Sequence, residues 1–149
     1  MRTPMELTVT TPLAIVLRDA DVTSVRAEDA SGGFGIWPGH RDFLTVLGAS
    51  VLRWKRAGED RWRYCALHGG VMRVTGGARL EVACREAVPG DDLAALETDV
   101  RARFEAADDA ARRARGEQMR LHAVAIRRLM QRLGRPDDET VDALAEAFR

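Results

Sequence analysis

Histidines and cysteines are the side chains of this sequence that could bind a metal ion or act as nucleophiles. His40, His68 and His122 lie far apart in the chain, and none forms the H-x-H pattern with a nearby carboxylate that a barrel metal site needs. Cys65 and Cys84 have no C-x-x-C partner, which disfavours a zinc site or a disulfide scaffold and indicates a reducing compartment. The sequence therefore predicts no catalytic residue and no metal site.

Structural roles are the alternative for the histidines. His122 falls on the apolar face of a predicted helix, where a packed histidine is expected. His40 and His68 each lie beside a glycine turn, so each either stabilises that turn through a hydrogen bond or contacts a partner. The residues alone leave both roles open.

Glycine pairs could in principle cradle a phosphate group. None of them opens a predicted helix or carries the G-K-[ST] sequence of a phosphate-binding loop. Turns between strands explain them better, and no nucleotide cofactor is predicted from them. The pairs are Gly32 and Gly33, Gly69 and Gly70, and Gly76 and Gly77.

Composition limits the architecture and the partners. The chain has 149 residues, 46% hydrophobic and 31% charged, which is enough for one well-buried core and an appendage. Its 23 basic and 23 acidic residues give a formal net charge of +0, which disfavours a general nucleic-acid binder. No apolar run has the length of a signal peptide or a membrane span, so we expect membrane association only through partners.

Short alternating runs fill residues 1–88, which we predict to be a β-sandwich domain. Turn residues separate these runs at intervals typical of a sandwich or barrel, including Thr11 with Pro12, Ala57 with Gly58, and the three glycine pairs. The predicted strands are residues 7–9, 15–17, 22–25, 44–47, 51–54, 64–67, 71–74 and 80–83.

Helical periodicity replaces this alternation in residues 89–149. Asp91 and Asp92 provide a helix cap, and the first apolar stripe comprises Leu93, Leu96, Val100, Phe104, Ala107 and Ala111. Residues 112–117 are polar and predict a break, and a second amphipathic helix then ends near Gly134. We therefore expect an antiparallel helical hairpin, followed by a short third helix carrying Val141, Leu144 and Phe148, and an α+β fold overall.

The stretch GFGIWPGH combines glycines, a proline, large apolar residues and a histidine, as a strand running into a shaped turn does. The longer stretch FGIWPGHRDFLTVL, residues 34–47, resembles the F-G-I-x-P-G-H-x-x-[FL]-L-x-x-L signature of the ε subunit of F-type ATP synthases. Three further features follow in that family's order: V-x-T-P at residues 9–12, a glycine pair followed by VMRV at residues 69–74, and a late strand at 80–83.

This resemblance implies a non-catalytic rotor subunit in the central stalk of an ATP synthase, acting in ATP synthesis and proton transport. It implies that the sandwich contacts the γ subunit and the membrane ring beneath the catalytic α/β assembly, and that the C-terminal hairpin inhibits ATP hydrolysis. It places the chain peripherally on the cytoplasmic face of a bacterial inner membrane. The residues it suggests for the contact with γ or the ring are Ile36, Pro38, Gly39, His40, Gly69 and Gly70.

Two departures from the family pattern are visible. Some members bind ATP through [IL]-D-x-x-R-A, but the stretch LETDVRA at residues 96–102 places Asp99 one residue out of register, or about 100° around an α-helix. We therefore expect no bound nucleotide, with Glu97 as the residue that could take the place of the aspartate. The tail GRPDDETVDALAEAFR extends past the point where many members end.

A different class of protein stays open as the alternative. A free-standing β-sandwich module could bind a sugar or a peptide through Trp54 and Trp62, although buried tryptophan is the more common arrangement in a small sandwich. A ligand screen by tryptophan fluorescence distinguishes the two hypotheses, because a rotor subunit is expected to give no response to a small ligand.

Overall fold

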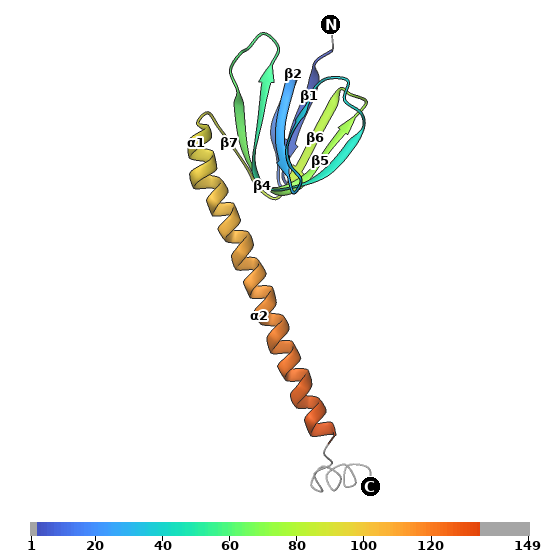
Figure 1. Ribbon diagram of the computed structural model, residues 1–149, viewed down its shortest axis with the longest axis vertical. Helices are drawn as coiled ribbons and strands as arrows, with labels where there is room; N and C mark the ends of the chain where they lie inside the picture. The colour runs from blue at the N-terminus through green and yellow to red at the C-terminus, as the bar shows by residue number, and fades with distance from the viewer. Residues whose placement is uncertain (1–2, 135–149) are drawn as a thin grey trace. The chain divides into compact units, whose positions relative to one another are not determined.

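The computed structural model describes residues 3–134, in which seven strands precede one helical segment (Figure 1). The strands are β1 (Met5–Thr10), β2 (Ile15–Asp29), β3 (Gly32–Ile36), β4 (Phe43–Arg56), β5 (Arg63–Thr75), β6 (Arg79–Cys84) and β7 (Ala87–Gly90). The helical segment comprises α1 (Leu93–Ala95), a π-helical turn η1 (Leu96–Arg101) and α2 (Ala102–Leu133). Two compact units divide the chain, Met1–Ala106 and Ala107–Arg149. The predicted boundary between residues 88 and 89 falls within β7.

The strands close on themselves. The order is β1-β6-β5-β4-β2-β3, and β1 also pairs with β2, so five of the strands form a closed circuit with β3 and β7 added at its edges. Strand β1 is parallel to β6, and β1 is antiparallel to β2. This arrangement is the predicted β-sandwich, in which the strands are also connected in a closed circuit as in a barrel.

Strands β4 and β5 each pass through a corner of the sandwich. In β4 the buried side chains change from Leu47 to Ser50 and Leu52, and in β5 from Leu67 to Met72, so each strand switches the side that faces the core. Gly69 lies at this switch with a φ of +57°, which favours glycine. The predicted turn at Gly69 and Gly70 is therefore wrong: the chain bends there but continues as one strand.

A second pair of predicted strands also forms one continuous strand, and the reason is again an irregularity along that strand. Strand β2 covers both predicted runs at 15–17 and 22–25, and its pairing with β4 is irregular between Val22 and Ser24. The alternation of buried residues shifts at such an irregularity, so a long bent strand looks like two short strands in the sequence.

The main core lies between the two layers of strands. Val22, Leu52 and Leu80 are among its fully buried side chains, and Trp54 is 5% exposed. Burial of large aliphatic side chains of this kind contributes about 1.5–3 kcal/mol each before entropy is counted. The core therefore belongs to the sandwich unit alone.

Asp92 caps the helical segment, as predicted, because its carboxylate accepts hydrogen bonds from the backbone N–H groups of Ala94 at 3.0 Å and Ala95 at 3.4 Å. After the π-helical turn, α2 runs without interruption through residues 112–117. The predicted break and the antiparallel packing of residues 91–111 against 119–133 are therefore wrong. Arginine, glutamate and alanine all favour helix, and the single Gly116 costs only about 1 kcal/mol.

The predicted third helix, with Val141, Leu144 and Phe148, lies outside the described residues. Within residues 3–134, none of the helices combines the length and apolar character needed to cross a bilayer.

Candidate partner interface

The two outer faces of the sandwich differ in what covers them. The start of the helical segment covers one face, where Leu96 and Phe104 pack against Ala66 with 5%, 2% and 0% exposure. Phe104 also stacks on the His68 ring at a centroid distance of 4.7 Å and an interplanar angle of 7°. The chain therefore provides its own cover for this face.

The opposite face is open and carries exposed apolar side chains. Strand register places Thr10, Ala83, Val71 and Val46 in one row across β1, β6, β5 and β4. A second row comprises Thr8, Glu81, Arg73 and Leu44. We call these eight residues the open face. Leu44, Val46 and Val71 are 66%, 71% and 41% exposed, and a shallow depression of about 320 Å³ lies among the two rows.

Charge on the open face is balanced internally. Arg73 donates from Nε and Nη2 to one Glu81 carboxylate oxygen at 3.1 and 2.5 Å. On the adjoining edge, Arg18 and Glu6 are 3.4 Å apart. Exposed pairs of this kind contribute little to stability. The surface therefore offers a partner an apolar strip with no net charge.

A loop at one end of the sandwich contains most of the predicted contact residues. Gly39 donates its backbone N–H to the Gly77 carbonyl oxygen at 2.8 Å, and Gly76 donates to Asp42 at 2.8 Å. Gly39 has a φ of +84°, so the turn requires the conformation that glycine adopts most readily. These bonds fix the loop to the turn between β5 and β6.

Only part of this loop is accessible. Ile36 is 1% exposed and Pro38 is also buried, so their side chains support the loop from beneath. The Nδ1 atom of His40 lies 2.7 Å from the Arg41 carbonyl oxygen, so the turn-stabilising role is present. Trp37 is 51% exposed and lies over Gly35, where a Cβ would be 3.4 Å from the indole ring. The accessible surface of the loop therefore comprises Trp37, Gly39 and part of His40, together with the exposed charged residues Arg41 and Asp42.

Gly69 and Gly70 are separated from this loop along β5, and Gly70 pairs with Leu47 and Cys84. A Cβ on Gly70 would lie 2.2 Å from the Ala83 carbonyl oxygen, so glycine is needed there for close strand packing. The structure thus brings Ile36, Pro38, Gly39 and His40 together but not the glycine pair. A partner-contact role for any of the six stays a prediction.

Sequence reasoning missed Leu44, Val46 and Val71. The run FLTVL at the start of β4 places apolar residues on both sides of the strand, because Phe43 and Leu47 face the core while Leu44 and Val46 face outward. Apolar residues on both sides of a strand indicate that both sides are covered. That signal was available before the structure.

Metal and thiol chemistry find no support in the geometry. In the part of the chain that the structure describes, no three histidine, cysteine or acidic side chains form a group that could hold a metal ion. Cys65 and Cys84 are both free and buried. Burial raises the pKa of Cys65 to about 12 and also raises the pKa of Cys84. Both thiols are therefore core residues of low reactivity.

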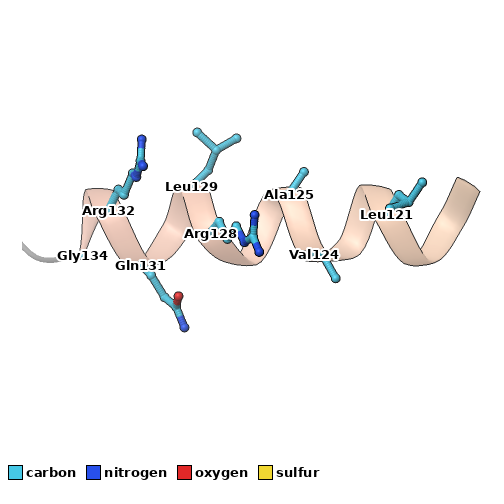
Figure 2. A pocket seen from close by; sticks show the side chains of 8 residues that line it. All are labelled: Leu121, Val124, Ala125, Arg128, Leu129, Gln131, Arg132 and Gly134. Atoms are coloured by element: carbon cyan, nitrogen blue, oxygen red, sulfur yellow. The ribbon is translucent and has the colours of Figure 1, made fainter.

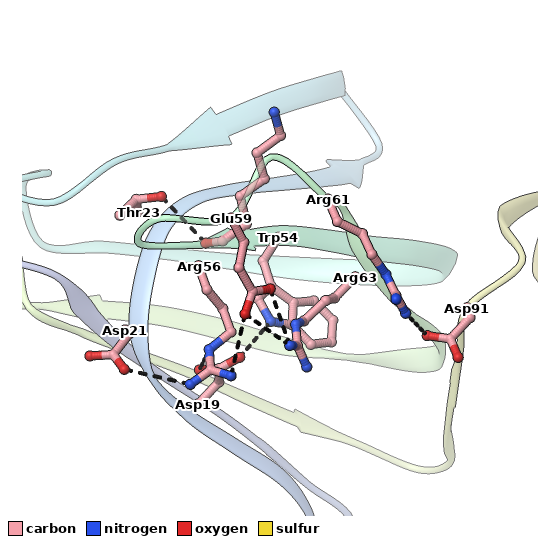
Figure 3. A network of polar contacts seen from close by, with 10 residues as sticks. Asp19, Asp21, Thr23, Trp54, Arg56, Glu59, Arg61, Arg63 and Asp91 are labelled. Carbon is pink, nitrogen blue, oxygen red and sulfur yellow. Dashed lines mark hydrogen bonds and ion pairs between the residues drawn. The ribbon is translucent and has the colours of Figure 1, made fainter.

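The two tryptophans of the alternative hypothesis do not form an exposed platform. Trp54 is buried, and its Nε1–H donates to Asp19 at 3.0 Å within a polar network (Figure 3). In the same network Arg56 lies 3.0 Å from Asp19. Trp62 is half-buried, with the Lys55 ammonium 4.9 Å from its ring centroid. A sugar-binding or peptide-binding role for this pair is not favoured.

The sandwich matches a known family model. Residues 4–90 match the β-sandwich domain of the ATP synthase delta/epsilon chain. Over 144 residues the chain is 58% identical to ATP synthase epsilon chain 2 of Cereibacter sphaeroides, covering 97% of this chain and 98% of that one. It is 47% identical to ATP synthase epsilon chain 2 of Paraburkholderia xenovorans, covering 89% and 95%.

Solved structures share the fold at low sequence identity. A chain of the Euglena gracilis mitochondrial ATP synthase superposes with a TM-score of 0.55 at 21% identity, covering 60% of this chain and 55% of that one. The family match spans the whole sandwich, and the relatives extend the match through the helical segment. The chain therefore belongs to the delta/epsilon chain family of ATP synthase.

Proposed function

We propose that this chain is the ε-type rotor subunit of an ATP synthase, a non-catalytic protein of the central stalk that joins γ to the membrane ring. The family match and the 58% identity over nearly the whole chain support this role. The subunit takes part in ATP synthesis and proton transport as part of the complex. The binding-module alternative is not favoured, because Trp54 belongs to the core.

The open face is the proposed contact with γ. The observation that carries this assignment is the exposed apolar group of Leu44, Val46 and Val71 on sandwich strands that Leu96 and Phe104 do not cover. Contiguous apolar patches on a protein surface commonly mark sites of contact with another protein. Arg73 and Glu81 lie in the middle of the open face, and the ion pair between them would stay intact when γ binds.

The end loop is the proposed contact with γ or the ring. Trp37 supplies an exposed aromatic side chain, and such residues are common at interface centres. Gly39 and His40 present the turn, while Ile36 and Pro38 hold it from beneath. Two separate surfaces on one rigid sandwich allow the subunit to link two partners.

The complex is membrane-associated, and we place the chain peripherally on the cytoplasmic face of a bacterial inner membrane. The curated relatives at 58% and 47% identity are bacterial. Inhibition of ATP hydrolysis by the C-terminal unit is part of the proposal, but with a continuous α2 through residues 112–117 in place of the predicted hairpin turn.

Co-expression with γ and the catalytic α/β assembly tests the proposed function. We expect the chain to co-purify with the assembly and to show no ATP hydrolysis alone. A chain that stays separate from γ, and that instead gives a saturable tryptophan-fluorescence response to a sugar or peptide, would contradict the proposal.

A further inference from the structure

Arg73 and Glu81 form an ion pair in the middle of the open face. They are directly opposite each other on β5 and β6, and their side chains are 62% and 40% exposed. We call these two residues the central pair. The other six residues of the open face are uncharged, namely Thr8, Thr10, Leu44, Val46, Val71 and Ala83.

The fold of the sandwich does not depend on the central pair. The residues beside Arg73 on β5 are Met72 and Val74, which provide the core contacts with 0% and 1% exposure. The central pair lies on the other side of these strands, where an exposed ion pair contributes little to stability. Uncharged residues could therefore occupy both positions in a sandwich of the same fold.

The central pair also has unused hydrogen-bonding groups. Both hydrogen bonds from Arg73, donated by Nε and Nη2, go to the Oε2 atom of Glu81. Within residues 3–134, the Nη1 group of Arg73 and the Oε1 atom of Glu81 have no protein hydrogen-bond partner. Water can satisfy both groups while the face is exposed, and a protein that covers the face must satisfy them in its place.

Covering the central pair with an apolar surface is unfavourable. Removing two charges from water can cost more free energy than their mutual attraction returns, unless further hydrogen bonds form. The depression on the open face is lined by Arg73 and Glu81 together with Leu44 and Val71, so a partner side chain that enters it meets both charges. The face therefore favours a partner that presents an acceptor to Arg73 and a donor to Glu81.

The exposed surface at the end of α2 differs from the open face in this respect. Figure 2 shows Arg128 and Arg132 on the same surface as Leu121 and Leu129. Residues 119–134 contain neither aspartate nor glutamate, so these arginines have no acidic neighbour within that segment to fix their positions. The central pair is instead held by two hydrogen bonds, which orient both charges before a partner arrives. Fixed donors and acceptors discriminate between partners more sharply than adaptable ones do.

We propose that the central pair selects the γ subunit to which this chain binds. This selection rests on the proposed contact between the open face and γ. The apolar side chains of Leu44, Val46 and Val71 provide most of the affinity, and the central pair excludes γ subunits that have only apolar groups at the facing position. The γ subunit of the same complex presents a hydrogen-bond acceptor to Arg73 and a donor to Glu81.

Titration calorimetry of the full chain with two γ subunits tests this selection. One γ comes from the same complex, and the other comes from an ATP synthase whose own ε chain has uncharged residues at both positions of the central pair. Arg73→Leu with Glu81→Leu should lower the ratio of the two affinities at least about 30-fold, because the first γ loses two hydrogen-bonding partners and the second no longer covers two charges. Arg73→Glu with Glu81→Arg keeps an ion pair but exchanges its ends, and should weaken binding to the first γ at least about 10-fold.

The ion pair between Arg18 and Glu6 provides the matched control. Its side chains are 63% and 44% exposed, close to the values for the central pair, but it lies on the edge beside the open face. Arg18→Leu with Glu6→Leu should change the affinity ratio by less than about 3-fold. If the leucine variant of the central pair melts at a lower temperature than the wild type, Arg73→Ala with Glu81→Ala repeats the test with smaller side chains and the same expected result.

An unchanged affinity ratio in the folded double variant would overturn the proposed selection, as would undiminished binding of the end-exchanged variant to the first γ. An equal change of the ratio in the Arg18 and Glu6 control would also overturn it, by assigning selection to surface charge in general. A failure of the proposed function has a different result, because Val46→Glu would then leave binding to γ unchanged. That result removes the basis of the selection as well.

Discussion

Gly39 and Gly77 touch through their backbones: the Gly39 N–H lies 2.8 Å from the Gly77 carbonyl oxygen, and a Cβ on Gly77 would lie 2.7 Å from the Gly39 Cα. Both residues have positive φ, at +84° and +66°. This contact holds the proposed partner loop against the turn between β5 and β6, so the loop keeps its shape without a bound partner.

Gly77→Ala should therefore destabilise the sandwich by about 2–4 kcal/mol, because left-handed strain adds to a backbone clash. Gly76→Ala is the matched control, since Gly76 has a φ of +61° but open space around its Cβ position. The control should cost only about 1 kcal/mol from backbone strain. Urea unfolding of both variants measures the difference, and equal costs would show that the contact with Gly39 is unimportant.

Gly70→Ala should cost more than about 3 kcal/mol or prevent folding, because its Cβ would lie 2.2 Å from the backbone oxygen of Ala83. Gly48→Ala, at the same corner on β4, meets nothing within 4 Å and should be nearly neutral. Thermal melting distinguishes the two. A stable, cooperatively melting Gly70→Ala variant would contradict the close packing of β5 against β6.

Cys65 should resist thiol reagents in the native protein. With its pKa raised from 9.0 to about 12, the thiolate fraction at pH 8 falls about 1000-fold relative to an unfolded chain. Because the folded-state pKa lies above the unfolded value, stability should begin to fall as the pH rises above 9. Labelling followed by mass spectrometry checks this, and native labelling as fast as in urea would contradict the buried position.

Truncation after Ala106 should leave a cooperatively folding sandwich. Leu96 and Phe104, which cover Ala66, are then retained. Truncation after Pro89 removes that cover and should lower the free energy of unfolding by several kcal/mol, at about 25 cal/mol per Å² of apolar surface exposed. Calorimetry compares the two fragments, and equal stabilities would show that the helical segment contributes nothing to the sandwich.

Sequence reasoning recovered the two-part architecture but not the continuity of its elements. Alternation predicts strands well while a strand stays in one layer, and it fails at Gly69, where β5 switches the side that faces the core. The stretch at residues 112–117 looked like a break because it lacks apolar residues. A helix can form there without apolar residues, because arginine and alanine both favour helix.

Helix register gives a second example. The comparison of LETDVRA with the nucleotide-binding motif assumed α-helical geometry, whereas Leu96–Arg101 form a π-helical turn, which takes up one additional residue. Arg101 lies 3.2 Å from both Glu28 and Glu105. Periodicity does not report the tertiary surroundings of this turn, which lies against β4 and β5 and forms the ion pair with Glu28 of β2. The expectation that no ATP binds stays a prediction.

The open face was predictable in part. Apolar residues on both sides of β4 are visible in FLTVL, but only the strand register shows that Val46 and Val71 are neighbours. Which outer face the helical segment covers is a tertiary property. The motif at residues 34–47 identified the family and directed attention to the end loop, although Leu44 and Val46 within the same motif are exposed on β4.

The affinity of the purified chain for γ, measured by titration calorimetry, tests the central claim most directly. Val46→Glu places a charge in the open face and should weaken binding at least 100-fold, whereas Leu13→Glu, at a residue that is 96% exposed outside that face, should change it less than 3-fold. Both variants must show the wild-type melting temperature. Equal affinities of the two variants for γ would contradict the open face as the contact surface.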